Sequence, residues 1–342
     1  MKAVRFDEYG DRSVLRYEDA PDPAPGPGDA IIRVRACAVN HVDIDMRNGS
    51  SRLPLQLPHI LGFEVAGDVE AVGDGVAEVS VGDRVTPLFQ IHCRGCDWCR
   101  RGEHMHCESI SMLGVQAPGG YAEYVAAPAW ALIPLPETLT YEDAASIQTT
   151  FSTVWHALVT RAHLRDGEWV LVNAAGSGVG TAGIQVARLF GGRVIASAGA
   201  DDKLERARAL GAEATVNYRT DDLAARVREI TAGRGVDVVM ESVGGDVLAA
   251  SLNALGKDGR VVTVGAHAGE VVPVDAILLF RNQRSLIGSV RATEQEIRHV
   301  IDLVGQRRLQ TVIHRTLPLA DAAEAHRILE DREQFGKVIL AP

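Results

Sequence analysis

The sequence lacks three features that would place the protein in a membrane, outside the cell or on nucleic acid. Its 342 residues contain no uninterrupted apolar run approaching the roughly 18 residues of a membrane span. The opening residues, MKAVRFDEYG, have no apolar core of a secretory signal. The net charge of -10 argues against binding to nucleic acid, because a phosphate backbone requires a basic protein surface. We therefore expect a cytoplasmic protein with a small-molecule partner and with no nucleic-acid or membrane partner.

Cysteine is scarce, and four of the five cysteines fall within CRGCDWCRRGEHMHC, at Cys93, Cys96, Cys99 and Cys107. A reducing compartment disfavours disulfides. The spacing C-x2-C-x2-C-x7-C is instead typical of a loop that presents four thiolates to Zn(II). Four sulfurs leave no open coordination position, so we predict one structural zinc ion per chain. Unmetallated thiols, or iron in the same cage, are the alternatives. Cys37, within IIRVRACAV, is predicted to be a buried strand residue.

Up to about residue 125 the pattern is that of strands. Ile32, Val34 and Ala36 alternate with Arg33 and Arg35, which is the period of a half-buried strand. Similar short runs recur in EVAGDVEAVG, VGDRVTPLF and YAEYVAA, separated by Gly, Asp and Pro. This part of the chain therefore predicts a small, mostly antiparallel β domain.

After about residue 150 near-continuous apolar runs alternate with amphipathic segments. The runs, which are typical of strands covered on both faces, are WVLVN (169–173), RVIAS (193–197), ATV (214–216), VDVVME (236–241) and RVVTVG (260–265). Leu223, Val227 and Ile230 share one helical face after a capping Asp221 or Asp222. The alternation predicts an α/β fold with a doubly wound parallel sheet.

The first strand of that sheet leads into AAGSGVG, residues 174–180, and then into the helical segment TAGIQVARLF. Glycines permit a tight turn and close approach of backbone to a pyrophosphate, which would lie at the positive end of the helix dipole. A G-x-G-x-x-G pattern runs from Gly178 to Gly183. The pattern alone is weak, but a strand before it, a helix after it and further βα units make it a predicted dinucleotide site.

The end of the second strand indicates which dinucleotide is bound. An NAD site would carry an acid there, whereas this chain has Ser197, Ala198 and Gly199. Asp202 and Glu205 predict a capping box, which places Lys203 in the first helical turn, where the dipole disfavours a cation. We infer that Lys203 meets the 2′-phosphate of NADPH. A solvated helix lysine is the alternative.

Taken together, the motifs resemble those of the medium-chain dehydrogenase/reductase superfamily over essentially the whole chain. They are VRACAVNHVDIDMRNG, LPHILGFEVAGDVEAVGDGV, CRGCDWCRRGEHMHC, GGYAEYVAAP, AAGSGVG, ESVGGD, VVTVGA and FGKVIL. The resemblance implies a GroES-like domain, residues 1–125 completed by 290–342, and a Rossmann domain, residues 126–289, with the active site between them. It also implies a homodimer or homotetramer, joined near LLFRNQRSLIGSV at the edge of the Rossmann sheet.

The resemblance further implies a set of cofactor contacts. In the family's register the glycine turn ends at Gly180, and Lys203 and Tyr218 meet the 2′-phosphate in members that use NADPH. The predicted cofactor-binding residues are Thr153, Gly176, Ser177, Gly178, Val179, Gly180, Ser197, Lys203, Tyr218, Val243, Val264, Gly265, Ala266, Gly288 and Ser289.

The departures from the family's zinc alcohol dehydrogenases concern a second, catalytic zinc. Where those enzymes carry its ligands, this chain has Asn40, Phe63 and Thr149, and Val42 replaces the hydroxyl that relays the alcohol's proton. Amide, phenyl and neutral hydroxyl are poor ligands for Zn(II), which prefers thiolate, imidazole or carboxylate. Glu64 alone does not hold the ion. We therefore expect a chain without a catalytic metal.

Without a Lewis acid, oxidation of simple alcohols would be poorly assisted, whereas reduction of a conjugated C=C bond needs a hydride donor and hydrogen-bond donors at the carbonyl oxygen. Asn40 within VNHVD resembles the quinone oxidoreductase branch. Our hypothesis is an NADPH-dependent reductase of activated C=C bonds or quinones, whose substrate is a small molecule with a conjugated carbonyl. Asn40 would orient the carbonyl or the nicotinamide. His41 would be the proton donor or a hydrogen-bonding residue at the domain rim.

Two rival interpretations stay open. One is a zinc alcohol dehydrogenase with unusual ligands, for instance Asp43, Glu64 and either His59 or His41. The other is a noncatalytic NADPH-binding protein, because cofactor motifs survive loss of turnover.

Overall fold

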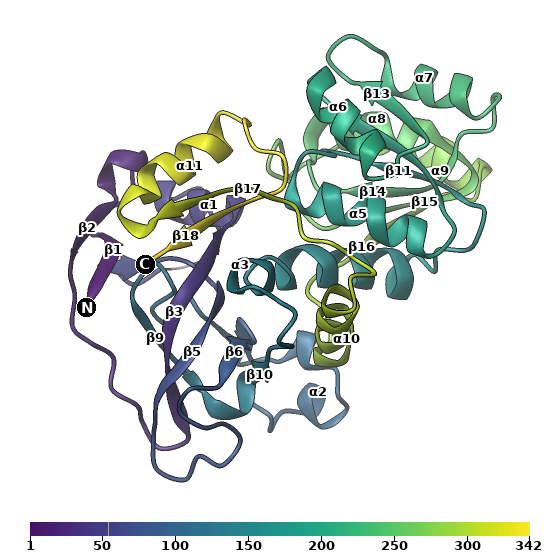
Figure 1. Ribbon diagram of the computed structural model, residues 1–342. Helices are drawn as coiled ribbons and strands as arrows, with labels where there is room; N and C mark the ends of the chain where they lie inside the picture. The colour runs from purple at the N-terminus through teal and green to yellow at the C-terminus, as the bar shows by residue number, and fades with distance from the viewer. Residues whose placement is uncertain (54) are drawn as a thin grey trace. The chain divides into compact units, whose positions relative to one another are not determined.

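The computed structural model describes residues 1–53 and 55–342 (Figure 1). The chain forms two compact units. The first unit comprises Met1–Gln148 and Thr293–Pro342, and the second unit comprises Thr149–Ala292. No helix in the described ranges combines the length and the apolar character needed to cross a membrane.

The first unit is built on β-sheets. Its largest sheet has the strand order β10 (Leu132–Pro134), β6 (Arg84–Pro87), β5 (Glu64–Val72), β3 (Asp29–Val39), β18 (Lys337–Ala341) and β17 (Ile313–Pro318), with β9 (Tyr124–Pro128) also paired to β3. Smaller sheets are formed by β2 (Arg16–Asp19), β1 (Lys2–Phe6) and β4 (His59–Ile60), and by β7 (Gln90–Ile91) and β8 (Ser111–Met112). The pairs are antiparallel except for β17 with β18.

Helices of the first unit are short. They are α1 (His41–Asn48), α2 (Asp97–Arg100), α3 (Tyr141–Ala144), α10 (Glu294–Gly305) and α11 (Ala322–Glu330), with 3-10 turns η1 (Arg12–Val14), η2 (His104–His106), η3 (Ala129–Ala131) and η6 (Leu319–Asp321). The C-terminal segment completes the sheet, because β18 pairs with β3. Residues 126–148 also belong to this unit, since β10 pairs with β6, so its boundary lies beyond the predicted residue 125.

Strand β3 shows the burial that its alternating sequence predicts. Arg33 and Arg35 are exposed, whereas Ile32 and Val34 are buried. The predicted alternation does not extend to Ala36, because the register of β3 against β5 shifts between Val34 and Ala36, and Ala36 packs with Ala38, Ala66 and Ile339 instead of with Ile32 and Val34.

The second unit is a parallel sheet with helices between its strands. The strand order is β13 (Ala214–Asn217), β12 (Arg193–Ala198), β11 (Trp169–Val172), β14 (Val236–Glu241), β15 (Leu255–Thr263) and β16 (Ser285–Gly288), and every pair is parallel. The helices are α4 (Thr153–Trp155), α5 (Gly178–Leu189), α6 (Asp201–Ala209), α7 (Leu223–Ile230), α8 (Gly245–Ala254) and α9 (Ala276–Arg281). The π-helical segments η4 (Gln148–Ser152) and η5 (His156–Arg161) flank α4.

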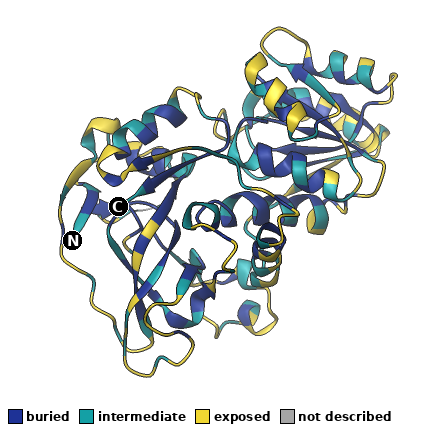
Figure 2. Ribbon diagram, viewed as in Figure 1, coloured by how far each residue is buried: buried dark blue, intermediate teal, exposed yellow. Residues whose placement is uncertain are grey.

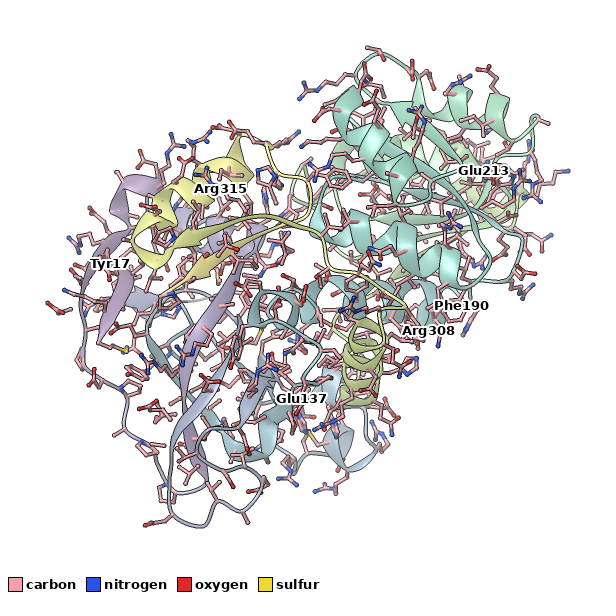
Figure 3. The ribbon with its side chains drawn as sticks, in the orientation of Figure 1. Tyr17, Glu137, Phe190, Glu213, Arg308 and Arg315 are labelled. Carbon is pink, nitrogen blue, oxygen red and sulfur yellow. The ribbon has the colours of Figure 1, made fainter. Side chains whose placement is uncertain are left out.

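This order confirms the predicted doubly wound fold and places the topological switch point between β11 and β14, which are neighbours in the sheet. Ligands of such sheets bind at the carboxyl ends of the strands near this point. The central strands are buried, and Figure 2 shows them in dark blue. At the far end of α5, Phe190, labelled in Figure 3, packs edge-on against Trp155 with ring centroids 5.2 Å apart.

Two helix starts test the predicted caps. Asp222 accepts a hydrogen bond from the Ala225 N–H, which confirms it as the cap of α7. The predicted capping box from Asp202 to Glu205 is wrong, because α6 already begins at Asp201 after an extended Ala200. The Asp201 carboxylate instead accepts a hydrogen bond from Asn217 Nδ2 at 2.8 Å, which anchors the helix start to the end of β13.

Candidate functional site

The four clustered cysteines of the first unit lie where one metal ion could join them. Their sulfurs are all within 4.8 Å of one another, and the Cys93 and Cys99 sulfurs are 3.9 Å apart. Tetrahedral zinc, with bonds of about 2.3 Å, separates its sulfur ligands by about 3.8 Å. A disulfide would bring two sulfurs to about 2 Å, and the cysteines are unbridged. The residues therefore fit a structural zinc ion held by Cys93, Cys96, Cys99 and Cys107.

Backbone N–H groups of this loop point at the sulfurs. Cys93 Sγ accepts from the N–H groups of Gly95 at 3.5 Å and Cys96 at 3.3 Å, and Cys107 Sγ accepts from the Cys93 N–H at 3.3 Å. Backbone hydrogen bonds from Cys99 and Glu108 lower the pKa of Cys96 to about 6. Burial instead raises the pKa of Cys99 to about 12, so the loop by itself favours the thiolate, the form that binds a metal, at Cys93 and Cys96 and not at Cys99.

In the second unit, the glycine turn lies between β11 and α5. Ala174 has a φ of +49°, and Ser177 caps α5 by accepting a hydrogen bond from the Gly180 N–H at 2.9 Å. A Cβ on Gly180 would lie 2.2 Å from the Ala174 carbonyl oxygen, and one on Gly183 would lie 2.9 Å from Val172 Cγ1. Gly180 therefore allows the tight turn, and Gly183 allows the helix to pack closely on the strand.

Most of the predicted cofactor-binding residues gather at the carboxyl ends of the parallel strands. Gly176 to Gly180 follow β11, Ser197 lies in β12, Lys203 in α6, Tyr218 after β13, Val243 after β14, Val264 to Ala266 after β15, and Gly288 and Ser289 end and follow β16. Thr153 begins α4, away from this set of strand ends in the chain. The Ser289 hydroxyl is buried and has no hydrogen-bond partner among the described residues. Backbone turns gathered at the carboxyl ends of the strands, with one buried hydroxyl that lacks a partner among the described residues, fit a bound dinucleotide.

The end of β12 is framed by polar groups from the next strand. A Cβ on Gly199 would lie 2.9 Å from both the Tyr218 hydroxyl oxygen and Arg219 Nε. Lys203 is half-buried on the first turn of α6. Ser197 is fully buried, and its hydroxyl donates to Asn173 Oδ1 at 2.7 Å. Sequence reasoning overlooked Arg219, although its place directly after Tyr218 was a usable signal.

In the first unit, Asn40, Glu64 and Lys337, at the ends of three strands, form a hydrogen-bonded cluster that we call the cage. The Lys337 ammonium donates to Asn40 Oδ1 at 2.6 Å and to Glu64 Oε2 at 2.9 Å. Asn40 Nδ2 donates to Glu64 Oε2 at 3.2 Å and to the Ala38 carbonyl at 3.3 Å. Glu64 begins β5, Lys337 begins β18, and Asn40 follows β3. The cage fixes the Asn40 amide, whose oxygen faces a cation and whose N–H groups face acceptors.

Behind the cage, Asp43 holds the start of α1. Its Oδ2 accepts hydrogen bonds from the Asn40 N–H at 2.8 Å and from the Tyr121 hydroxyl at 3.4 Å. The side chain is completely buried, and this burial raises the pKa of Asp43 to about 7. His41, the first residue of the same helix, is partly exposed.

The network continues from Tyr121 to the C-terminal helix α11. The Tyr121 hydroxyl lies 3.1 Å from His326 Nε2, and His326 Nδ1 lies 3.1 Å from Arg47 Nη1. A guanidinium only donates, so His326 Nδ1 accepts and its Nε2–H donates to Tyr121, whose own proton is then directed at Asp43. Burial, reinforced by Arg47, lowers the pKa of His326 to about 3, which keeps the imidazole neutral.

Known proteins resemble the chain over its whole length. Residues 26–137 match the family described as alcohol dehydrogenase GroES-like domain, and residues 178–306 match the zinc-binding dehydrogenase family. An alcohol dehydrogenase of Geobacillus stearothermophilus is 31% identical, with 99% of each chain covered. A quinone oxidoreductase of Homo sapiens is 32% identical, covering 99% of this chain and 97% of that protein. The crystal structure of an NAD-dependent alcohol dehydrogenase superposes with a TM-score of 0.96 at 41% identity and full coverage of both chains.

The chain belongs to the medium-chain dehydrogenase/reductase superfamily. This membership confirms the family resemblance and the two-part architecture of a GroES-like domain with a Rossmann domain. It also makes the protein an oxidoreductase. The named relatives divide between alcohol dehydrogenases and quinone oxidoreductases, so the superfamily alone leaves the reaction undecided.

At the positions that the family resemblance assigns to a catalytic zinc, Asn40 and Phe63 are poor ligands for a metal ion. Phe63 is buried, with its ring centroid 5.4 Å from that of Phe89. The Asn40 amide and the Glu64 carboxylate are both bound to the Lys337 ammonium. A benzene ring offers Zn(II) no lone pair, and a neutral amide is a weak ligand for it. Gly62, with a φ of +93°, allows the turn before Phe63, because a Cβ there would lie 2.4 Å from the Tyr121 ring.

Proposed function

We propose that the protein is an NADPH-dependent oxidoreductase that reduces activated C=C bonds or quinones by hydride transfer without a catalytic metal. The observation that carries this proposal is the pair Asn40 and Phe63, which stand at two positions that the family resemblance assigns to zinc ligands: the Asn40 amide oxygen already accepts from the Lys337 ammonium, and the buried Phe63 ring offers no donor atom. The similarity to quinone oxidoreductases supports the same reaction class.

Reduction of a conjugated carbonyl compound needs one hydride and one proton. NADPH, when bound, supplies the hydride to the β-carbon, and negative charge develops on the carbonyl oxygen. The two N–H groups of Asn40 already donate to Glu64 and Ala38. Because these contacts fix the Asn40 side chain, we assign Asn40 the role of orienting the substrate carbonyl or the nicotinamide. His41, at the start of α1, is our candidate for the proton donor.

A preference for NADPH is part of the proposal, with Lys203, Tyr218 and Arg219 as the residues that meet the 2′-phosphate. Tyr218 and Arg219 are supported by their place beside Gly199, where an NAD site would carry an acid, and Lys203 by its place in the first turn of α6. Each lost charge-assisted contact should lower the ratio of kcat/KM for NADPH to that for NADH about tenfold. The comparison uses Lys203→Ala and Arg219→Ala, with Arg208→Ala, an exposed position on α6, as the matched control. A wild type that uses NADH better, with a ratio unmoved by Lys203→Ala, would contradict the preference.

The reaction is tested by a substrate screen together with a zinc count. NADPH and NADH consumption is followed with enones, quinones, aldehydes and alcohols, and zinc is measured in the purified protein. We expect turnover of enones or quinones and one zinc ion per chain. A second tightly bound zinc with alcohol oxidation would favour an alcohol dehydrogenase with unusual ligands. Tight cofactor binding without any turnover would favour a noncatalytic binding protein.

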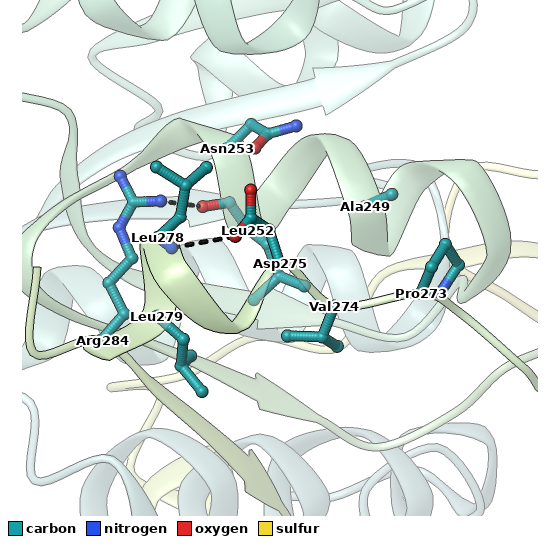
Figure 4. A pocket seen from close by; sticks show the side chains of 9 residues that line it. All are labelled: Ala249, Leu252, Asn253, Pro273, Val274, Asp275, Leu278, Leu279 and Arg284. Atoms are coloured by element: carbon teal, nitrogen blue, oxygen red, sulfur yellow. Dashed lines mark hydrogen bonds between the residues drawn. The ribbon is translucent and has the colours of Figure 1, made fainter. Parts of the chain in front are cut away.

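We also propose that the protein is a homo-oligomer joined through the outer strand of the parallel sheet. β16 is the last strand in the sheet order. Seven of the eleven exposed large apolar side chains of the described residues fall within residues 271–290. A pocket of about 110 Å³ lies beside them, and its lining combines apolar Leu252, Pro273, Val274, Leu278 and Leu279 with polar Asn253, Asp275 and Arg284 (Figure 4). Such a concentration of apolar surface along an open strand edge is typical of a protein interface.

A further inference from the structure

The second unit holds a buried carboxylate, Glu241, that none of the predicted cofactor contacts includes. Glu241 is the last residue of β14 and has no exposed surface. Its Oε1 accepts hydrogen bonds from the N–H groups of Val243 and, at 2.9 Å, of Gly244. Its Oε2 accepts from Asn173 Nδ2 at 2.7 Å and from the Ser251 hydroxyl at 3.4 Å. The donors to this buried carboxylate are all neutral. Burial of a carboxylate without a paired cation costs desolvation free energy, which these hydrogen bonds offset.

The partners of Glu241 belong to the loops at the switch point of the sheet. Asn173 is the residue between β11 and the glycine turn, and it is also buried. Its amide donates to Glu241 and, at 2.7 Å, to the Ser251 hydroxyl, and its oxygen accepts from Ser197 at 2.7 Å. β11 and β14 are neighbours across the point where the strand order reverses. One carboxylate thus links the ends of β11, β12 and β14.

A fourth loop is joined through the backbone. The Val243 carbonyl accepts from the Ala268 N–H at 2.7 Å, and the Gly245 N–H donates to the Gly269 carbonyl at 3.0 Å. A Cβ on Gly244 would lie 2.7 Å from the Ala266 Cα. The loop that Glu241 folds therefore packs directly on the loop that follows β15, which contains the predicted contacts Val264 to Ala266.

We propose that Glu241 is a positioning residue for the dinucleotide, setting the mutual placement of the glycine turn and the loops after β14 and β15. The inference rests on the proposed dinucleotide site and deepens it. Glu241 does not itself need to touch the cofactor. Its carboxylate accepts from the backbone of one loop and from Asn173 at the root of another, so both loops depend on one side chain.

The pairing of Glu241 with Asn173 offers a reciprocal exchange. Asn173→Asp alone sets two carboxylates against each other across 2.7 Å, which is unfavourable in a buried site. Glu241→Gln alone can place an amide N–H against the N–H of Asn173. The clash is relieved only if the Asn173 amide flips, and Asn173 would then donate to the Ser197 hydroxyl instead of accepting from it. The double exchange restores a donor facing an acceptor, with the donor now on residue 241, and leaves the shape of the pair nearly unchanged.

The experiment measures the dissociation constant of the dinucleotide for wild type, both single variants and the double exchange, using whichever of NADPH and NADH wild type binds more tightly. The matched control is Thr231→Val. This buried hydroxyl donates to the Val227 carbonyl at 2.8 Å and accepts from the Gly235 N–H at 2.9 Å, before the opposite end of β14. Melting temperatures are recorded for all five proteins.

We expect Asn173→Asp to weaken dinucleotide binding about tenfold or more, and the double exchange to recover it to within about threefold of wild type. Thr231→Val should lower the melting temperature and leave the dissociation constant unchanged. If Asn173→Asp does not fold, Glu241→Gln and the double exchange carry the comparison. Unchanged binding in the single variants, or a failed recovery in a folded double exchange, would overturn the role of Glu241. Failure of wild type to bind either dinucleotide would instead overturn the proposed function.

Discussion

At the scale of single residues, the surroundings of Asp43 move the pKa of its carboxyl close to neutral pH. Burial raises its pKa, while the Asn40 N–H, the Lys337 ammonium and the Tyr121 hydroxyl favour the charged form and limit the rise to about 7. Burial raises the pKa values of Cys37 and Tyr121 well above their ordinary values and lowers the pKa of His326 to about 3, so these three groups stay neutral near pH 7. Asp43, by contrast, is expected to change charge near neutral pH.

This shift predicts a loss of stability as pH rises. An acid whose folded pKa lies above its unfolded value binds more protons in the folded state, so its contribution to stability is lost as pH passes through the folded pKa. Between pH 6 and pH 8 the free energy of unfolding of wild type should fall by roughly 1.4 kcal/mol relative to Asp43→Asn. Urea unfolding at both values measures the difference. Asp68→Asn is the control, since the pKa of Asp68 is lowered and its effect belongs to acidic pH. An equal change in all three proteins would show that Asp43 does not titrate there.

At the scale of elements, we expect the cysteine loop to depend on a bound metal ion more than on its secondary structure. It contains α2, of four residues, and η2, of three residues, which are too short to persist alone. Removal of zinc by a chelator, or Cys107→Ser, should lower the melting temperature on the order of 10 °C. Turnover per folded molecule should stay near that of wild type, because a closed four-sulfur site takes no part in the reaction.

The matched control for the loop is Glu108→Ala, an exposed neighbour that offers no sulfur. It should retain zinc and melt with wild type. Calorimetry with parallel metal analysis distinguishes the variants. Complete loss of turnover in a folded, zinc-free protein would contradict the structural role assigned to the ion.

Elements with a local pattern could be predicted, and α1 shows what was overlooked. The buried runs 193–197 and 236–241 predicted β12 and β14 because strands covered on both faces are apolar along their length. The pattern before residue 125 predicts strands and misses the helix His41–Asn48. Its signal was Asn40 followed three residues later by Asp43, whose carboxylate accepts from the Asn40 N–H.

At the scale of the whole molecule, the part of the site that the sequence did not reveal is held together by contacts between distant residues. Lys337 meets Asn40 across 297 positions, and His326 meets Arg47 across 279. Periodicity reports only which face of an element is buried, so it cannot pair a residue of the C-terminal helix with one near the N-terminus. The cysteine cluster was accessible to sequence reasoning because its four ligands fall within one short loop.

The proposed oligomer gives a prediction at the same scale. Phe280 and Leu286 are 67% and 42% exposed, and they lie on α9 and on the edge strand β16. If a second copy covers them, acidic residues at both positions would bury unpaired charges in the interface and separate the subunits. The double variant Phe280→Glu with Leu286→Glu should therefore elute with the mass of one 36.7 kDa chain, whereas wild type elutes as a multiple of it.

Val81→Glu, at a position 64% exposed in the first unit, is the control and should leave the mass unchanged. Light scattering after gel filtration measures the masses. A monomeric wild type would refute the oligomer, and an oligomer that survives the double variant would move the interface away from β16.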